Sequence, residues 1–113
     1  MNVVVLRGTL SSPPVSRALA SGSLLVSLEL TTVVDGVSSS VPVAWFDPPA
    51  EVLWAAGDEL LVTGTVRRRF FRSGGLTQTR TEVAATEVVP LGQRRRVRAT
   101  LTRALALIDI AAP

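Results

Sequence analysis

The sequence predicts an all-β domain: a five-stranded barrel with one short helix between the third and fourth strands, plus a possible C-terminal helix. Three observations lead to this prediction. Apolar runs of strand length recur along the chain, turn residues separate them, and one helix-start signal follows the third run. With 113 residues the chain is long enough for one compact domain but not for two. We assign residues 1–90 to the barrel and residues 91–113 to a C-terminal extension.

The first part of the chain supplies three predicted strands, at 3–10, 24–31 and 37–46. The first strand is apolar on both faces up to Arg7, which favours burial on both sides, as at a subunit interface. Residues 11–23 are rich in turn signals and are predicted as a loop. Asp35-Gly36 is a strong signal for a tight hairpin between the second and third strands. Pro42 cannot donate a ladder hydrogen bond, so it indicates an edge or bulge position.

A short helix is predicted at 50–56. Asp47 is a candidate N-cap, Glu51 lies near the positive end of the helix dipole, and Gly57 is a suitable C-terminal stop. Two further strands follow, at 59–71 and 76–89, joined by a turn at 73–75. Gly64 marks a place where the fourth strand can bend sharply. Three strands, a helix and two strands, in this order and with short turns, fit the OB barrel.

The extension after residue 90 leaves two interpretations open. Its apolar residues recur at helical spacing, at Val97, Leu101, Leu105 and Ile108. This spacing predicts a short amphipathic helix whose apolar stripe docks on the barrel or on a neighbouring subunit. The alternative is a frayed basic tail.

The distribution of charge favours an anionic partner for the second half of the chain. Residues 1–66 contain two arginines and six carboxylates, whereas residues 67–113 contain ten arginines and three carboxylates. A strongly basic segment of this kind is typical of a surface that attracts an anionic partner. All basic residues are arginine, which makes planar, bidentate contacts with phosphate.

Missing residue types exclude most catalytic chemistry. The sequence contains no His, Cys, Lys or Tyr. A Ser-His or Cys-His pair, a lysine Schiff base and a thiolate or imidazole metal site therefore cannot be built. We expect no enzymatic activity, no cofactor and no metal site. The N-terminal apolar run has no basic leader and is too short for a signal peptide or a membrane span, so a soluble cytoplasmic protein is expected.

The strongest functional signal lies between residues 64 and 82. Side chains alternate faces along a strand, so one face of the fourth strand carries Thr63, Thr65, Arg67, Arg69 and Phe71. Guanidinium groups that attract phosphates, beside a ring on which a base can stack, suit a single nucleic-acid strand. The alternative is a solubilising arginine-rich strand with one stray phenylalanine.

Several short segments stand in a recognisable order and spacing. They are Asn2–Leu10, Pro14–Arg17, Ser21-Gly22, Val41–Phe46 followed by Ala50-Glu51, Gly57–Gly64 and Thr81–Val83. Together they resemble the bacterial single-stranded DNA-binding protein family over about residues 1–90. No single segment is specific, but their combination is.

The resemblance implies a base-stacking site on the third and fourth strands. It places Phe46 and Phe71 at two stacking positions and Arg67 and Arg69 among the neighbouring basic positions. The full predicted nucleic-acid-binding set is Phe46, Arg67, Arg69, Phe71, Arg72 and Arg80. The other large aromatic residues, Trp45, Trp54 and Phe70, are predicted to lie in the core instead.

The chain departs from the family pattern at several places, including a shorter helix and the lack of a long linker. Ser40 stands where the family commonly has another aromatic residue, and the Asp35-Gly36 hairpin is shorter than in many members. Fewer stacking rings imply weaker binding or a smaller footprint. The family's acidic C-terminal tip is missing, so the sequence does not support recruitment of replication and repair enzymes.

The resemblance implies a function in DNA replication or DNA repair on the nucleoid. The sequence leaves open whether the protein acts in replication, in repair or in transformation. We expect sequence-independent binding of single-stranded DNA by a homotetramer, with a dimer as the second choice and RNA as an open alternative ligand. The alternative function is an OB-fold scaffold or accessory subunit with little DNA affinity, which acts through protein–protein contacts.

Overall fold

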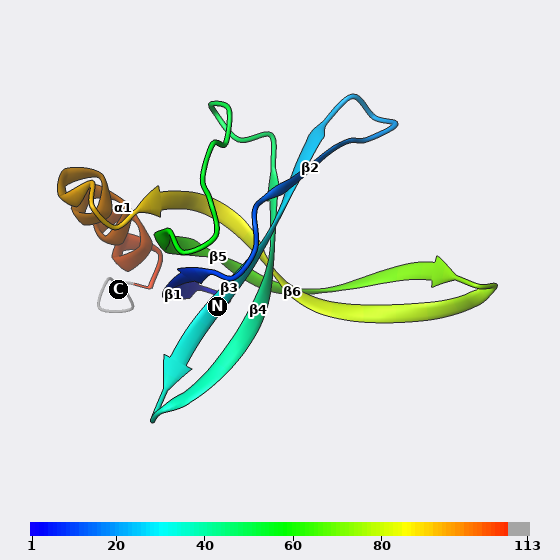
Figure 1. Ribbon diagram of the computed structural model, residues 1–113, viewed down its shortest axis with the longest axis horizontal. Coiled ribbons are helices and arrows are strands. Elements are labelled where there is room, and N and C mark those ends of the chain that lie inside the picture. Colours follow the sequence, from blue (N-terminus) through cyan, green and yellow to red (C-terminus); the bar gives the residue numbers. More distant parts are fainter. Residues whose placement is uncertain (109–113) are drawn as a thin grey trace.

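The computed structural model describes residues 1–108, which form a β-barrel followed by one helix (Figure 1). The elements are β1 (Val4–Leu10), β2 (Val15–Ala18), β3 (Leu24–Val34), β4 (Val37–Phe46), β5 (Glu59–Ser73), β6 (Leu76–Pro90) and α1 (Arg94–Leu107). The barrel closes in the order β1–β5–β6–β4–β3, because β3 pairs back onto β1. β4 and β6 run parallel, and the other pairs are antiparallel. The all-β prediction is confirmed, and the closed five-stranded barrel is consistent with an OB-like fold.

β2 is an addition to the predicted strands. It lies within 11–23, which was predicted as a loop, and it pairs antiparallel with the first part of β3. Every residue of β2 is exposed. The strand therefore extends one edge of the sheet without contributing to the core.

The predicted helix at 50–56 is wrong, because this segment forms an irregular loop. The carboxylate of the expected N-cap, Asp47, instead accepts a hydrogen bond from the Leu24 amide at 2.8 Å. At the other end, the Gly57 amide donates to the carbonyl of Leu10 at 2.8 Å. Seven residues give little helix stability on their own, so these tertiary contacts determine the conformation of the loop.

The two tight hairpins lie where the sequence predicts turns. Asp35 and Gly36 both have positive φ, of 52° and 77°, and join β3 to β4 as a two-residue turn. Gly74 and Gly75 have φ of 60° and 79° and join β5 to β6 in the same way. Such turns match the twist of the flanking strands. In Figure 1 both hairpins extend well beyond the barrel, in different directions.

The barrel interior is filled by aliphatic side chains and one tryptophan. The core residues are Leu10, Val26, Leu28, Leu30, Val43, Trp45, Leu60, Val62, Val83 and Val88. Trp54, from the irregular loop, stacks on Trp45 with ring centroids 5.7 Å apart. The core predictions for these two tryptophans therefore agree with the structure.

Gly64 lies where β5 changes register against β6. A Cβ atom at this position would collide with the backbone carbonyl of Ala84, so the close approach of the two strands requires glycine. The register shift thus lies at the residue where a bend was predicted. It also separates the part of β5 that lines the barrel from the part that continues into the hairpin.

The C-terminal helix exists and docks on the barrel, but only part of the predicted stripe faces it: Val97 and Leu101 are half-buried, whereas Leu105 and Ile108 are exposed. α1 packs on β5 and β6 through Thr100 and Ala104, which are buried. Leu105, from the predicted apolar stripe, is 61% exposed. Small side chains allow the helix to approach the sheet closely, and Arg103 and Thr100 are hydrogen-bonded to Glu87 of β6. The rest of the predicted extension, residues 109–113, lies outside the described residues.

Within residues 1–108, no helix has both the length and the apolar character needed to cross a membrane.

Candidate functional site

Four of the six predicted site residues meet on one surface, where β4, β5 and β6 lie side by side. Arg67 places its guanidinium 4.9 Å from the centroid of the Phe46 ring, and Arg69 lies 5.7 Å from the centroid of the Phe71 ring. Glu82 of β6 stands between the two arginines. We call these five residues the ring–arginine cluster.

Glu82 fixes the position of Arg67 most firmly. Arg67 donates to Oε2 of Glu82 from both Nε, at 3.0 Å, and Nη2, at 2.7 Å. The Nε of Arg69 lies 3.4 Å from Oε1 of the same carboxylate, and this buried Nε makes no hydrogen bond within residues 1–108. Glu82 is only 4% exposed, so a nearly buried carboxylate is compensated by two cations.

Glu82 was missed as a site residue, although the sequence contained a signal for it. A two-residue turn at Gly74-Gly75 sets the register of the hairpin, and this register places Glu82 directly opposite Arg67. Residues that face each other in an antiparallel pair share one side of the sheet. Counting back from a two-residue turn would have predicted the ion pair, whereas the predicted turn at 73–75 places Thr81 opposite Arg67.

Both rings of the cluster are accessible in part. Phe46 is 38% exposed and Phe71 is 37% exposed. Each ring carries a guanidinium over it, so some of its accessible area is already covered by a cation. A planar ligand can stack on what remains of the ring or on the outer side of the guanidinium plane.

Arg80 lies beside the cluster and pairs with a second carboxylate, that of Glu29. Its Nη2 lies 2.9 Å from Oε1 of Glu29, on β3, and the other oxygen of Glu29 accepts a hydrogen bond from Ser40 at 3.0 Å. Ser40 is the position where the resemblance expects another aromatic residue. Here it extends a polar network across β3, β4 and β6.

The remaining predicted residue, Arg72, lies away from the cluster. It pairs with Thr77 near the tip of the β5–β6 hairpin, on the opposite side of the sheet from Arg67, Arg69 and Phe71. Its Nη2 donates to the carbonyl of Gly75 at 3.3 Å. The structure therefore brings together four of the predicted residues, places Arg80 beside them and separates Arg72.

Phe70 was predicted to lie in the core, and this prediction is wrong. The side chain is 66% exposed. Strand alternation does place Phe70 on the same face as Val62, which is a core residue. However, Phe70 lies in the part of β5 that extends past the barrel, where no other element of residues 1–108 covers that face.

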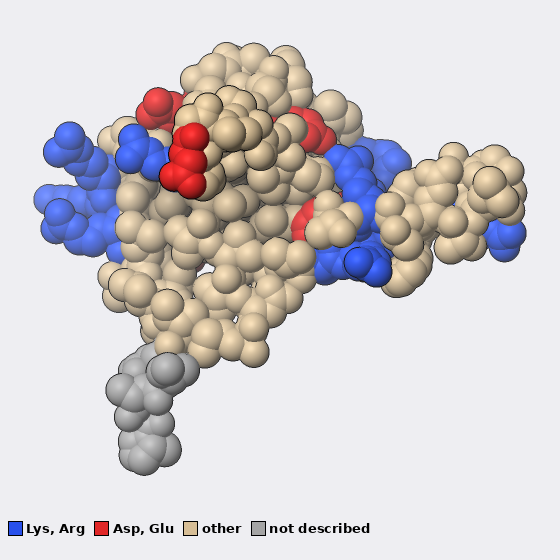
Figure 2. Space-filling model, turned by 90° about the horizontal axis from the view of Figure 1, so that it is seen from below, with Lys and Arg blue, Asp and Glu red and all other residues tan. Residues whose placement is uncertain are grey.

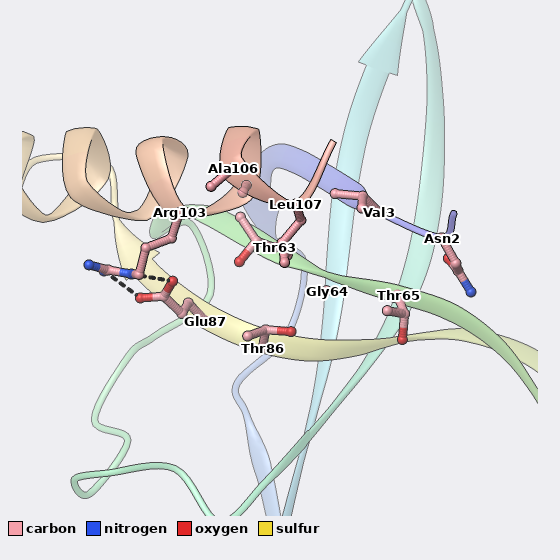
Figure 3. Close-up of a pocket in the computed structure, with 11 residues that line it drawn as sticks. Asn2, Val3, Thr63, Gly64, Thr65, Thr86, Glu87, Arg103, Ala106 and Leu107 are labelled. Carbon is pink, nitrogen blue, oxygen red and sulfur yellow. Dashed lines mark hydrogen bonds and ion pairs between the residues drawn. The ribbon is translucent and has the colours of Figure 1, made fainter. Parts of the chain in front are cut away.

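A hollow lies between α1 and the barrel, away from the ring–arginine cluster (Figure 3). It has a volume of about 380 Å³, and its lining is mainly apolar. Its charged groups are Arg103 and Glu87, whose carboxylate accepts hydrogen bonds from Arg103 at 2.7 and 2.9 Å. These hydrogen bonds lower the pKa of Glu87 below its ordinary value. The two charged side chains of this hollow, Arg103 and Glu87, therefore neutralise each other.

Basic side chains gather at two ends of the molecule in Figure 2, one beside α1 and one along the β5–β6 hairpin. Acidic side chains lie nearer the middle. The aromatic rings that carry a guanidinium belong to the hairpin end of the molecule and to the neighbouring end of β4.

No family model matches this chain, and no curated protein matches it either.

Proposed function

We propose that this protein binds single strands of nucleic acid, with DNA as the preferred ligand, by base stacking and arginine–phosphate attraction. The observation that carries the proposal is the ring–arginine cluster: two half-exposed phenylalanines, each beneath a guanidinium, on the surface of a closed barrel. Every base has a face that can stack, so such a site needs no sequence preference. The cluster contains no group that reads a 2′-hydroxyl, and RNA remains an alternative ligand.

The ion pairs of the cluster are compatible with phosphate binding. A guanidinium has five N–H donors, and Arg67 uses only two nitrogens on Glu82. Its side chain is 37% exposed, so the remaining donors can be reached from solvent. Glu82 thus holds the guanidiniums near the rings, at the cost of neutralising one of the two positive charges.

The assembly that we propose is a homotetramer, with a dimer as the second choice. β1 pairs with β5 along Val4–Thr9, but β3 pairs with it only at Thr9 and Leu10. One edge of β1 is therefore unpaired among the described residues over most of its length, and Val5 is 47% exposed on this strand. An unpaired edge can be completed by the same strand of a second copy. Light scattering that shows a monomer at micromolar concentration would exclude both assemblies.

A scaffold function is the second candidate. The tip of the β3–β4 hairpin exposes Val33, Val34 and Val37, which is a surface suited to a protein partner rather than to nucleic acid. Three predicted phosphate ligands, Arg67, Arg69 and Arg80, are already held by carboxylates. If these arginines serve only the fold, the barrel acts through protein contacts and binds DNA weakly.

A titration of the wild-type protein separates the two candidates. Fluorescently labelled oligo-dT, oligo-rU and duplex DNA of equal length are titrated at two salt concentrations. We expect tighter binding of the single strands, with a log–log salt slope of about 0.7 per phosphate contact. Weak binding without any preference for single strands over duplex would overturn the proposal and favour the scaffold. In the proposed function the protein coats single strands in the cytoplasm during replication or repair.

A further inference from the structure

The β5–β6 hairpin has a second face that the ring–arginine cluster does not use. Pairing across the hairpin places Arg68 opposite Thr81, Phe70 opposite Thr79 and Arg72 opposite Thr77. These residues alternate with those of the cluster and therefore point to the other side of the sheet. We call these six residues the second hairpin face.

The ring on this face is more accessible than the rings of the cluster. Phe70 is 66% exposed, compared with 38% for Phe46 and 37% for Phe71. Within residues 1–108, guanidiniums lie over Phe46 and Phe71 but none lies over Phe70. A base can therefore reach the face of Phe70 without displacing a cation.

The arginines on this face are also less compensated. Three arginines near the cluster, Arg67, Arg69 and Arg80, face two carboxylates, which leaves one unit of positive charge. Arg68 and Arg72 form no ion pair with any carboxylate of residues 1–108. The second hairpin face thus keeps two units of positive charge, and its paired β6 residues are all threonines, which add no negative charge.

The spacing of these residues suits an extended strand. Arg68 and Arg72 lie two residues before and after Phe70, which is about 7 Å along the strand on each side. All three side chains share one face, so a ring is flanked by a cation in both directions. An apolar protein partner would meet two unpaired charges and a row of hydroxyl groups on this face, which disfavours it as the occupant.

We infer that the second hairpin face is a further binding surface for a single nucleic-acid strand: Phe70 stacks one base, and Arg68 and Arg72 contact phosphates on either side of it. This inference rests on the proposed function, which it extends from one face of the hairpin to both. A bound strand then contacts opposite sides of the same two-stranded arm, and the hairpin becomes the centre of the interface.

The test compares two substitutions of Phe70 in the full chain. Phe70→Leu keeps an apolar side chain but removes the ring, and Phe70→Ala removes both. Because the residue is mostly exposed, both variants are expected to fold, and thermal melting checks this. We expect each to weaken oligo-dT binding by about 5- to 100-fold, which is the range for loss of one stacked base. Leu76→Ala, an exposed apolar residue at the tip of the same hairpin, is the control and should bind as the wild type does.

Four outcomes are informative. If Phe70→Leu binds oligo-dT as tightly as the wild type while Phe71→Leu binds more weakly, the further inference is overturned and the proposed function stands. If Phe70→Leu binds normally and Phe70→Ala changes the mass in light scattering, the face is a protein contact and the inference is likewise overturned. If the wild type does not bind oligo-dT, the proposed function fails. A weakening in Phe70→Leu and Phe71→Leu alike supports both.

Discussion

The β5–β6 hairpin and helix α1 are both rich in arginine, yet their arginines have different surroundings. In the hairpin, Arg67 and Arg69 are held by one buried carboxylate and lie over aromatic rings. In the helix, Arg94, Arg95 and Arg98 are exposed, without an ion pair to any carboxylate of residues 1–108. Positive charge is thus common to both ends, whereas within residues 1–108 a guanidinium lies over an aromatic ring only at the hairpin end.

The position of the helix arginines makes the contrast stronger. Arg94, Arg95 and Arg96 occupy the first turn of α1, which contains no acidic residue. The N-terminus of a helix carries a partial positive charge, so cations there are unfavourable by roughly 0.3–1 kcal/mol each. These arginines are therefore not explained by the stability of the helix. They provide a diffuse positive potential that attracts an anion without orienting it.

The largest effect that we predict comes from removing a ring of the cluster. Phe71→Ala should weaken oligo-dT binding by about 5- to 100-fold, because one stacked base is worth roughly 1–3 kcal/mol. Phe46→Ala should act similarly. Because both rings are partly exposed, the melting temperature should change little. Fluorescence anisotropy at one fixed salt concentration measures the affinity.

Removal of the helix is the experiment to compare with removal of a ring. Truncation after Leu91 removes α1 and should weaken binding more at low salt than at high salt, since a diffuse potential is screened. A truncated chain with unchanged melting would mean that α1 adds no stability, despite its buried Thr100 and Ala104. If Phe71→Ala loses no affinity while the truncated chain loses most of it at every salt concentration, the binding site lies at the helix end.

A smaller effect distinguishes the oriented arginines of the hairpin from the diffuse charge of α1. It is measured with two double variants that have the same net charge. Arg67→Ala combined with Arg69→Ala removes up to two phosphate contacts, so the log–log salt slope should flatten by up to roughly 1.4. Arg94→Ala combined with Arg95→Ala removes the same charge from α1 and should change the slope less. Equal flattening by the two double variants would show that only total charge matters, and the comparison between the two ends would then fail.

The smallest effect concerns the docking of the helix and depends on pH. Hydrogen bonds from Arg103 lower the pKa of Glu87 in the folded protein below its ordinary value of 4.5. A carboxyl with a lowered folded pKa stabilises the fold fully above its unfolded pKa, and this stabilisation is lost as the pH falls through the folded pKa. The melting temperature of the wild type should therefore fall below about pH 4.5.

Glu87→Gln is the matched variant for this measurement, because it keeps the shape of the side chain but does not titrate. Its melting temperature should be lower than that of the wild type at neutral pH, and the difference should shrink in acid. The effect is small, since Arg103 is largely exposed and the ion pair is screened by solvent. A difference that stays constant down to pH 3 would show that the ion pair does not hold α1 on the barrel.

Local chemistry explains which parts of this fold were predictable. The turn at Asp35-Gly36 was predicted correctly, and the turn predicted at 73–75 is one residue shorter, because Ser73 still pairs with Leu76. Two successive residues with positive φ favour glycine, aspartate or asparagine. The loop at 50–56 was not predicted, because hydrogen bonds to residues distant in sequence override its helix signals. A helix-capping pattern reports only the local conformational preference of residues close in sequence.

The site was predictable to a similar extent. Strand alternation placed Arg67, Arg69 and Phe71 on one face correctly, and the cluster followed once Phe46 was added from β4. Alternation could not show where the barrel ends along β5, so Phe70 was assigned to a core that does not extend that far. The face of α1 was assigned by hydrophobicity, whereas Thr100 and Arg103 dock through a carboxylate on a different element.

The topology of the barrel has a consequence for the order of events during synthesis. The β3–β4 and β5–β6 hairpins pair residues across two-residue turns, so each can form within microseconds of leaving the ribosome. Closure instead joins Val4 to Gly64 and places β6 beside β4, and such distant contacts form slowly. The nascent chain thus carries a finished β3–β4 hairpin with an exposed apolar face until residue 90 has emerged and the β5–β6 hairpin is complete. During this interval, the hairpins of neighbouring chains on one messenger RNA can pair with each other or with a chaperone.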